Sequence, residues 1–305
     1  MIIITSIAVL LAMLLFFIGT PVQITFARFF GIIVIMLVPI CIGSFLSAKI
    51  AMKPVQISWQ RQLDFTANAS HELRTPLAVI QSNLELVMDA PNETVDSQMK
   101  WLNNIHIETV RMSKLVGDLL TLSRSDSGAK TLEHSYFSLN AVAKEAASMF
   151  ETMANEKGIV ITVMADEEIT FSGDCPRIKQ LFVILLDNAV KYMKRPASVQ
   201  ITLAKKDRSI QLAVSDTGIG IAGEHVPKIF NRFYRVTCDK VSCAENSSQA
   251  VDGFGLGLSI AEWIVKEHGG SIKAESVPQK GTRFTAAFPI DHPRRMSYQR
   301  KICVL

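Results

Sequence analysis

The sequence predicts a multidomain protein: a transmembrane helical hairpin, then an antiparallel helical hairpin, then a domain of mixed α and β structure. Three observations support this prediction. Residues 1–50 are almost entirely apolar. Residues 51–128 repeat apolar and small side chains at spacings of three and four, as helices that pack into bundles do. Residues 129–292 mix alternating, strand-like segments with helical patterns, whereas the basic tail 293–305 shows no usable pattern.

Length, charge and cysteine content limit the classes to which the protein can belong. The chain has 305 residues, enough for more than one domain. Its net charge of +4 is too small to favour nucleic acid, and we expect no direct binding to it. The five cysteines are scattered and lack the spacing and histidine partners of a zinc site, so we expect reduced thiols.

Two uncharged segments near the start have the length of membrane-spanning helices, namely Ile2–Gly19 and Phe29–Ala48. A cleaved signal peptide is the alternative for the first segment. We favour a membrane hairpin, because no basic region precedes that segment and no small-residue cleavage site follows it closely. The connecting segment Thr20–Arg28 has nine residues, too few to bury a core, so we expect no extracytoplasmic ligand domain.

Basic residues indicate how this hairpin is oriented. Lys49, Lys53 and Arg61 follow the second segment, whereas Arg28 is the only basic residue in the connecting segment. Cytoplasmic flanks carry the excess of lysine and arginine. The protein is therefore predicted to be a multi-pass protein of the inner or cytoplasmic membrane, with everything after about residue 49 in the cytoplasm.

The next region predicts two long helices joined by a loop at Asp89–Thr94. We expect the first helix to begin after Lys53-Pro54, because proline disfavours helix at the residue before it. The predicted seams comprise Trp59, Leu63, Thr66, Ser70, Leu73, Leu77, Ile80, Leu84 and Val87 on the first helix, and Leu102, Ile105, Thr109, Met112, Val116, Leu119 and Ser123 on the second. One hairpin cannot cover both of its apolar stripes, so two copies should pair into a four-helix bundle, a homodimer.

His71 falls one residue off the first seam and should therefore face solvent. Glu72 is adjacent, Thr75 lies one turn further along the same face, and Pro76 should bend the helix. An exposed imidazole beside a carboxylate is a plausible nucleophile. Taken alone, however, an exposed helical histidine is far more often a surface residue without a catalytic role.

A small, polar segment, Ser125–Lys130, predicts a hinge before the α/β domain. In that domain Ser138 and Pro176 are typical of helix starts, and Lys157-Gly158 of a helix end. The predicted helices cover about residues 139–156, 176–193 and 253–268, and the predicted strands cover 159–164, 168–172, 199–204, 209–215, 271–276 and 282–289.

Asn188, Lys191 and Tyr192 are spaced to share one face of the second of these helices. An amide oxygen suits Mg²⁺ and a nearby lysine suits phosphate. A polar helix face without any ligand is an equally good interpretation of these three residues alone.

Two glycine-rich segments would let the backbone approach a ligand closely. Asp216, followed by Gly218 and Gly220, comes directly after a strand, and its carboxylate suits the exocyclic amine of adenine. The segment Gly253–Leu258, which includes Gly255, Leu256 and Gly257, opens a helix whose backbone N–H groups can bind an anion. The alternative, a nicotinamide dinucleotide loop, requires a preceding strand that Val236–Asp252 does not resemble.

Between the glycine segments lies an aromatic and basic stretch, Ile229–Arg235. Arg235 or Arg232 could reach a phosphate; alternatively, the neighbouring phenylalanines pack and both arginines are solvated. The polar, serine-rich Val236–Asp252 is long enough to be a mobile lid.

With these pieces in this order, the chain resembles, from about residue 50 to 290, a membrane-bound sensor histidine kinase of two-component systems. The short outer loop is similar to that of kinases that sense within the membrane or through an accessory membrane protein. The matching motifs are Ser70–Pro76 for the phosphoacceptor box, Asp187–Tyr192 for the N box, Asp216–Gly220 for the first glycine box, Phe230–Tyr234 for the F box, Gly253–Gly257 for the second glycine box and Gly281-Thr282 for the last glycine element.

The resemblance implies a dimeric helical hairpin bundle and an α/β sandwich ATP-binding domain of the GHKL type. It implies that Asn188 binds Mg²⁺ and that Asp216 recognises the adenine of ATP. His71 would take the phosphoryl group of ATP, with Glu72 accepting or orienting a proton, and pass it to an aspartate of a response regulator receiver domain. Thr75 would position a water that removes phosphate from that partner.

The chain departs from the family pattern at several points. Ile184 stands where the N box often has an extra asparagine, Met193 where a small polar residue is usual, and no signal-relay domain precedes His71. The alternative function is a nucleotide-binding membrane scaffold or a degenerate kinase that acts only as a phosphatase. The presence of His71, Asn188, Asp216 and both glycine boxes favours the active kinase.

Overall fold

The computed structural model describes residues 22–126, 132–193, 197–206, 208–236 and 253–290. The chain divides into two compact units, Met1–Ala67 and Asn68–Leu305. Four predictions lie wholly or largely outside the described residues: the first membrane segment Ile2–Gly19, the hinge beyond Asp126, the lid beyond Val236 and the basic tail.

The first described element is the helix α2, Val22–Met88. The predicted second membrane segment, Phe29–Ala48, lies inside it. Among the described residues, α2 is the helix long and apolar enough to cross a membrane, and side chains such as Phe30, Ile35 and Phe45 are largely exposed.

Two boundaries predicted for this region are wrong. The segment from Val22 to Arg28 is helical rather than a loop, because it contains no glycine or proline that would stop a helix. The helix also continues through Lys53 and Pro54. A proline inside a helix costs about 3 kcal/mol, a penalty that a helix of 67 residues with many other hydrogen bonds can tolerate.

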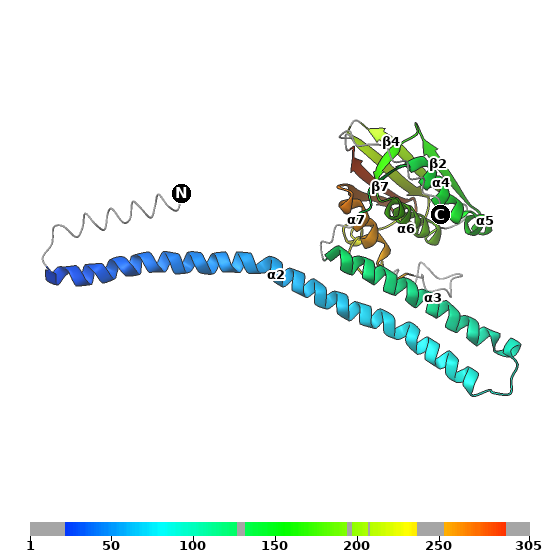
Figure 1. Ribbon diagram of the computed structural model, residues 1–305, viewed down its shortest axis with the longest axis horizontal. Coiled ribbons are helices and arrows are strands. Elements are labelled where there is room, and N and C mark those ends of the chain that lie inside the picture. The colour runs from blue at the N-terminus through cyan, green and yellow to red at the C-terminus, as the bar shows by residue number, and fades with distance from the viewer. Residues whose placement is uncertain (1–21, 127–131, 194–196, 207, 237–252, 291–305) are drawn as a thin grey trace. The chain divides into compact units, whose positions relative to one another are not determined.

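The end of α2 and the helix α3, Val95–Asp126, form the predicted antiparallel hairpin around the loop Asp89–Thr94 (Figure 1). Two buried amides connect its helices. The Asn104 amide donates to Asn83 Oδ1 at 3.1 Å, and the Gln98 amide donates to two carbonyl oxygens at the end of α2 and in the loop, at 3.2 and 2.8 Å. Pairing of buried polar groups fixes the register of the two helices.

The predicted seams are only partly buried within one chain. Leu115 and Leu122, outside the predicted seam, are 0% and 1% exposed, whereas Leu77, Leu84 and Val116 on the seams are 46%, 47% and 44% exposed. A helix in a bundle packs on more than one face, and the three-four spacing does not separate the face that packs within a chain from the others.

The α/β domain is built on a five-stranded sheet with the order β2-β4-β5-β7-β6, in which β2 and β4 are parallel and the other neighbours antiparallel. The strands are β2 Ile159–Ala165, β4 Ala197–Lys206, β5 Ser209–Asp216, β6 Ser271–Val277 and β7 Gly281–Pro289. A separate two-stranded sheet pairs β1, Ser135–Ser138, with β3, Thr170–Gly173.

The helices of this domain gather on one side of the sheet (Figure 1). They are α4 Leu139–Met149, α5 Glu151–Lys157, α6 Cys175–Lys191 and α7 Gly257–Glu267, and a short 3-10 helix covers Val226–Lys228. The core lies between helices and sheet, where α6 buries Ile178, Leu181 and Phe182 completely and the strands bury Ile201 and Leu212. The result is the predicted α/β layered arrangement.

Local signals set the helix ends. Ser138 caps α4 by accepting the Ala141 N–H, and Gly158 ends α5 in the left-handed conformation at φ 66°. The single helix predicted for 139–156 is wrong, because Phe150 divides it into α4 and α5. The 7% exposure of Phe150 indicates that burial of its ring accompanies this break. The strand β1, which is not among the predicted strands, is only four residues long.

Candidate functional site

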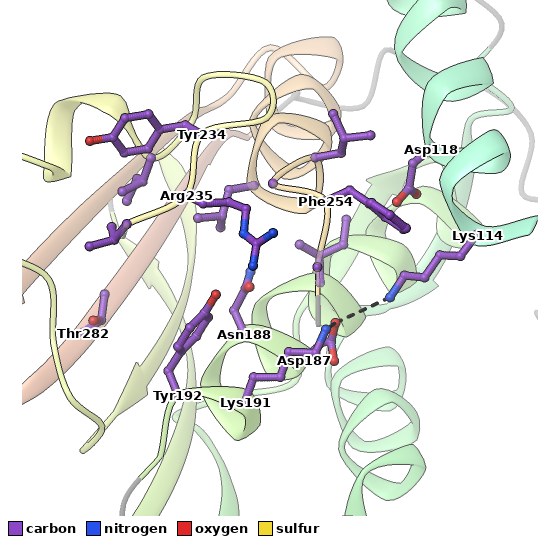
Figure 2. Close-up of a pocket in the computed structure, with 18 of the residues that line it drawn as sticks. Lys114, Asp118, Asp187, Asn188, Lys191, Tyr192, Tyr234, Arg235, Phe254 and Thr282 are labelled. Carbon is purple, nitrogen blue, oxygen red and sulfur yellow. Dashed lines mark hydrogen bonds and ion pairs between the residues drawn. The ribbon is translucent and has the colours of Figure 1, made fainter. Parts of the chain in front are cut away.

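A cavity of about 560 Å³ lies between α3, the end of α6, the loop after β5 and the start of α7 (Figure 2). Of the twelve residues predicted to contact a nucleotide, Gly218 alone does not line it. The eleven others are Asn188, Lys191, Tyr192, Asp216, Gly220, Arg235, Gly253, Gly255, Leu256, Gly257 and Thr282. Residues from five separate stretches of sequence therefore meet around one cavity.

Asp216 lines the cavity and is fixed by two backbone hydrogen bonds. Its Oδ1 accepts the backbone N–H of Gly218 at 2.8 Å and that of Thr282 at 3.1 Å. Burial raises the pKa of Asp216, while these two hydrogen bonds partly oppose the shift. Because both contacts use Oδ1, Oδ2 can accept a hydrogen bond from a ligand, and Gly218 serves the site by orienting the carboxylate.

The turn after Asp216 requires glycine at position 220. Gly220 has φ +67°, and a Cβ there would overlap the carbonyl oxygen of Val277. A hydrogen bond from Ile221 N to Ser276 Oγ at 2.7 Å holds the turn against β6. The backbone therefore forms this part of the cavity wall without a side chain in the way.

Asn188, Lys191 and Tyr192 lie in the last turn of α6, where Tyr192 is the C-terminal cap. Lys191 Nζ lies 2.7 Å from Oδ2 of Asp187, a residue for which no role was predicted. The described residues contain no group of three or more His, Cys, Asp or Glu side chains arranged for a metal. Mg²⁺ in phosphate-transfer sites is commonly held by one or two side-chain oxygens together with substrate phosphates and water, so the Asn188 amide oxygen fits that donor set.

The glycine segment Gly253–Leu258 leads into α7, and no side chain caps the start of that helix. Free N–H groups at a helix N-terminus favour an anion. A Cβ at Gly257 would lie 3.3 Å from Ile184, which shows how closely α6 and α7 pack at this point. Ile184, the departure from the usual N box, also lines the cavity.

The two arginines of the aromatic and basic stretch differ in position. Arg235 lines the cavity and points toward Asn188, whereas Arg232 does not line it (Figure 2). Phe230 packs edge-on against Phe284 with ring centroids 6.4 Å apart. The structure therefore favours Arg235 as the candidate phosphate ligand and agrees with the expected packing role of Phe230.

No sequence motif predicts the wall that α3 contributes, which consists of His106, Ile107, Val110, Arg111, Lys114 and Asp118. The Arg111 guanidinium lies over the Phe254 ring at 5.1 Å, and Lys114 Nζ lies 3.6 Å from Asp187 Oδ2. Burial raises the pKa of Asp118, Lys114 lowers it and Asp187 raises it further. Arg111, Lys114 and Asp118 share a helix face at spacings of three and four, a signal that the search for apolar seams passed over.

The predicted catalytic residues stand apart from the cavity. His71 and Thr75 are exposed on α2, Glu72 is half-buried, and none of the three lines the cavity. The helix continues through Pro76, which is buried, so the bend expected there stays a prediction. The exposure of His71 agrees with the expectation that its ring faces solvent.

Comparison with known proteins assigns both regions. Residues 61–128 match the His Kinase A (phospho-acceptor) domain, and residues 173–292 match the histidine kinase-, DNA gyrase B- and HSP90-like ATPase family. Over 258 residues, 83% of this chain, the sequence is 35% identical to sensor protein CiaH of Streptococcus pneumoniae. That alignment covers 55% of CiaH, and the chain spans about half the length of the curated relatives it matches.

Solved structures of histidine kinases align with most of this chain. The histidine kinase AdeS of Acinetobacter baumannii aligns with a TM-score of 0.58 and 25% identity, over 73% of this chain and 98% of that chain. Histidine kinase ThkA, crystallised in complex with response regulator protein TrrA, aligns with a TM-score of 0.58 and 26% identity, over 74% of this chain and 61% of that chain.

Proposed function

Because the chain belongs to the sensor histidine kinases of two-component systems, we propose that it transfers the γ-phosphoryl group of ATP to His71 and then to an aspartate of a response regulator. The observation that carries the proposal is the combination of an exposed histidine in a phosphoacceptor domain with an ATPase domain whose cavity is lined by Asp216 and Asn188.

The donor set of the cavity supports a specific way of binding Mg·ATP. Asp216 Oδ2 accepts a hydrogen bond from the exocyclic amine of adenine, since Oδ1 is already used by two backbone N–H groups. The start of α7 and Arg235 bind the phosphates. Asn188 would hold Mg²⁺, which when bound neutralises phosphate charge during transfer.

In the chemical step, the unprotonated ring nitrogen of His71 attacks the γ-phosphorus of ATP. A nitrogen–phosphorus bond forms while the bond from that phosphorus to the β–γ bridging oxygen breaks, and ADP leaves with the electron pair. Glu72 accepts the proton of the other ring nitrogen. Positioning and charge neutralisation supply most of the rate. Because His71 does not line the cavity, the step requires a domain movement, for which Ser125–Lys130 is the proposed hinge.

The second step passes the phosphoryl group to a receiver domain. The complex of ThkA with TrrA supports a response regulator as the partner of this chain. Thr75, exposed one turn after His71, would position a water that hydrolyses the partner's phosphoaspartate. Thr75→Ala should therefore reduce phosphatase activity and leave labelling of His71 intact; full phosphatase activity in this variant would refute the role of Thr75.

Burial and hydropathy support the remaining parts of the proposal. Exposed apolar residues on the hairpin, among them Leu77, Leu84 and Leu120, would be covered by a second copy, giving a homodimer. The apolar part of α2 supports anchoring in the cytoplasmic membrane. We further propose a second span before α2, catalytic domains in the cytoplasm, and sensing within the membrane or through an accessory membrane protein.

The test of the kinase is labelling of the full chain with ATP carrying ³²P on the γ-phosphate. His71→Gln should abolish labelling and leave binding of the ATP analogue AMP-PNP unchanged, whereas His134→Gln, a second exposed histidine, should label normally. Persistent labelling of His71→Gln would refute His71 as the acceptor. A wild-type chain that binds AMP-PNP but never becomes labelled would favour the scaffold or phosphatase-only alternative.

A further inference from the structure

The helix α3 of the phosphoacceptor domain forms one wall of the cavity in the ATPase domain, and its Lys114 points toward Asp187 near the end of α6 (Figure 2). Lys114 Nζ lies 3.6 Å from Asp187 Oδ2, next in sequence to Asn188, the candidate metal ligand. A basic residue of one domain therefore reaches the part of the other domain where phosphates are expected.

The contact between Lys114 and Asp187 is weak. The side chain of Lys114 is 63% exposed, and the same carboxylate oxygen already pairs with Lys191 Nζ at the shorter distance of 2.7 Å. Exposed ion pairs at long distance contribute little to stability. Asp187 thus has its own partner within α6, and Lys114 can leave it at little cost.

The charges around Asp187 favour an anionic ligand. Lys114, Lys191 and Arg235 line this part of the cavity, and Asp118 and Asp187 oppose them. Burial raises the pKa of Asp118, so its negative charge is disfavoured at this position. A lysine ammonium on a flexible four-carbon chain is well suited to turn toward phosphate oxygens.

We propose that Lys114 completes the phosphate subsite of the nucleotide from the opposite domain. When a nucleotide is bound, Lys114 breaks its ion pair with Asp187 and contacts the terminal phosphates instead. This inference rests on the proposed function, since it requires that the cavity binds Mg·ATP. Lys114 is then a residue that positions the phosphates. Binding of a triphosphate in the cavity is thereby linked directly to α3, the helix that forms the hairpin with α2, which carries His71.

The test measures binding to the full chain in detergent by calorimetry, using Mg·AMP-PNP and, separately, adenosine. Lys114→Gln should weaken AMP-PNP about tenfold, the loss of one charge-assisted hydrogen bond, and leave adenosine binding unchanged. Lys114→Arg should bind AMP-PNP nearly as well as the wild type. The matched control is Lys100→Gln, an exposed lysine of α3 that does not line the cavity, which should change neither affinity.

A double-mutant cycle with Asp187→Asn separates phosphate binding from simple docking of α3. If Lys114 only pairs with Asp187, Lys114→Gln will have no further effect in the Asp187→Asn background; we expect the tenfold loss to persist there. Unchanged AMP-PNP affinity in Lys114→Gln, an equal loss for adenosine, or disappearance of the effect in the Asp187→Asn background would each overturn the inference. A wild-type chain that binds neither ligand would instead refute the proposed nucleotide site itself.

Discussion

Replacing Asp216 with asparagine tests adenine recognition without disturbing the backbone around it. Asparagine keeps an Oδ1 that can accept the N–H groups of Gly218 and Thr282, which now lie at 2.8 and 3.1 Å. It replaces Oδ2 with an NH₂ group. The variant therefore removes the acceptor proposed for the exocyclic amine of adenine. In its place an NH₂ group, itself a hydrogen-bond donor, faces that amine, so the two groups cannot pair.

The loss of one hydrogen bond to a charged group sets the size of the expected effect. A hydrogen bond to a charged group is worth about 1.5–3 kcal/mol, so the Kd of Mg·AMP-PNP should rise about 10- to 150-fold. The NH₂ group can donate to the carbonyl oxygen of guanine, so the preference for adenine over guanine should shrink or reverse.

Stability should not suffer from the same change. Burial raises the pKa of Asp216 above its ordinary value, so stability is favoured below the unfolded-state pKa and lost as pH rises through the folded-state pKa. Above the folded-state pKa the folded protein carries the desolvation penalty of the charged carboxylate, and a neutral asparagine removes it. The Tm of Asp216→Asn should equal or exceed that of the wild type. In contrast, Asp216→Ala leaves two N–H groups without their acceptor, at about 1–3 kcal/mol each.

The assay is calorimetry of the full chain with Mg·AMP-PNP and Mg·GMP-PNP, combined with thermal melting. Asp118→Asn is the matched control, because Asp118 also lines the cavity and its pKa is also raised by burial, but it lies on α3. That variant should keep the purine preference of the wild type. If Asp216→Asn bound AMP-PNP within about twofold of the wild type, or lost both nucleotides together with a lower Tm, adenine recognition by Asp216 would be excluded.

Three further predictions concern Gly255 and Asn188, which line the cavity, and His268, which lies outside it. Gly255 has φ +69°, and a Cβ there would lie 2.8 Å from the carbonyl carbon of Phe233, so Gly255→Ala should lower the free energy of unfolding by at least about 1–2 kcal/mol. The control is Gly253→Ala, whose added Cβ would have no atom within 4 Å and which should leave the stability measured by calorimetry unchanged. His268 accepts the Asp174 N–H on Nε2, so Nδ1 carries the proton donated to the Ile264 carbonyl. Burial lowers the pKa of His268, so its contribution to stability is present above the ordinary pKa of 6.5 and is lost as pH falls below that value. The Tm should therefore fall between pH 7.5 and 5, and His268→Asn should reduce that fall. Asn188→Asp places a negative charge beside the phosphates and should weaken the binding of AMP-PNP in the presence of Mg²⁺. Equal affinities of the variant and the wild type for AMP-PNP, measured by titration with Mg²⁺ present, would contradict the role of Asn188 as a metal ligand.

Elements between residues 139 and 289 could be predicted to within a few residues because their signals are local. Ser138, Gly158 and Pro176 act on the backbone beside them, and period-two alternation marks strands with one buried face. The errors arose where a local rule is outweighed by the rest of a long helix or by packing. Pro54 lowers the local preference for helix, yet α2 continues through it, and Phe150 breaks a helix that the sequence pattern would extend.

The two sides of the nucleotide site differ in how far sequence could reveal them. Asn188, Asp216 and the glycines at 253, 255 and 257 lie in short motifs whose spacing carries their chemistry, and all of them line the cavity. Lys114 and Asp118 have no such motif. Their position beside the end of α6 depends on how α3 packs against α7, an arrangement that no periodicity within α3 encodes.

This difference has a consequence for regulation. A site built inside one domain can bind its ligand whatever the other domain does, whereas a site with one wall on α3 couples ligand affinity to the placement of that helix. The contact of Arg111 with Phe254 and that of Lys114 with Asp187 lie on the same wall. Any signal that rotates or shifts α3 by a fraction of a turn changes both contacts together. Nucleotide affinity should therefore respond to the state of the helical hairpin, and by reciprocity a bound nucleotide should restrain the hairpin.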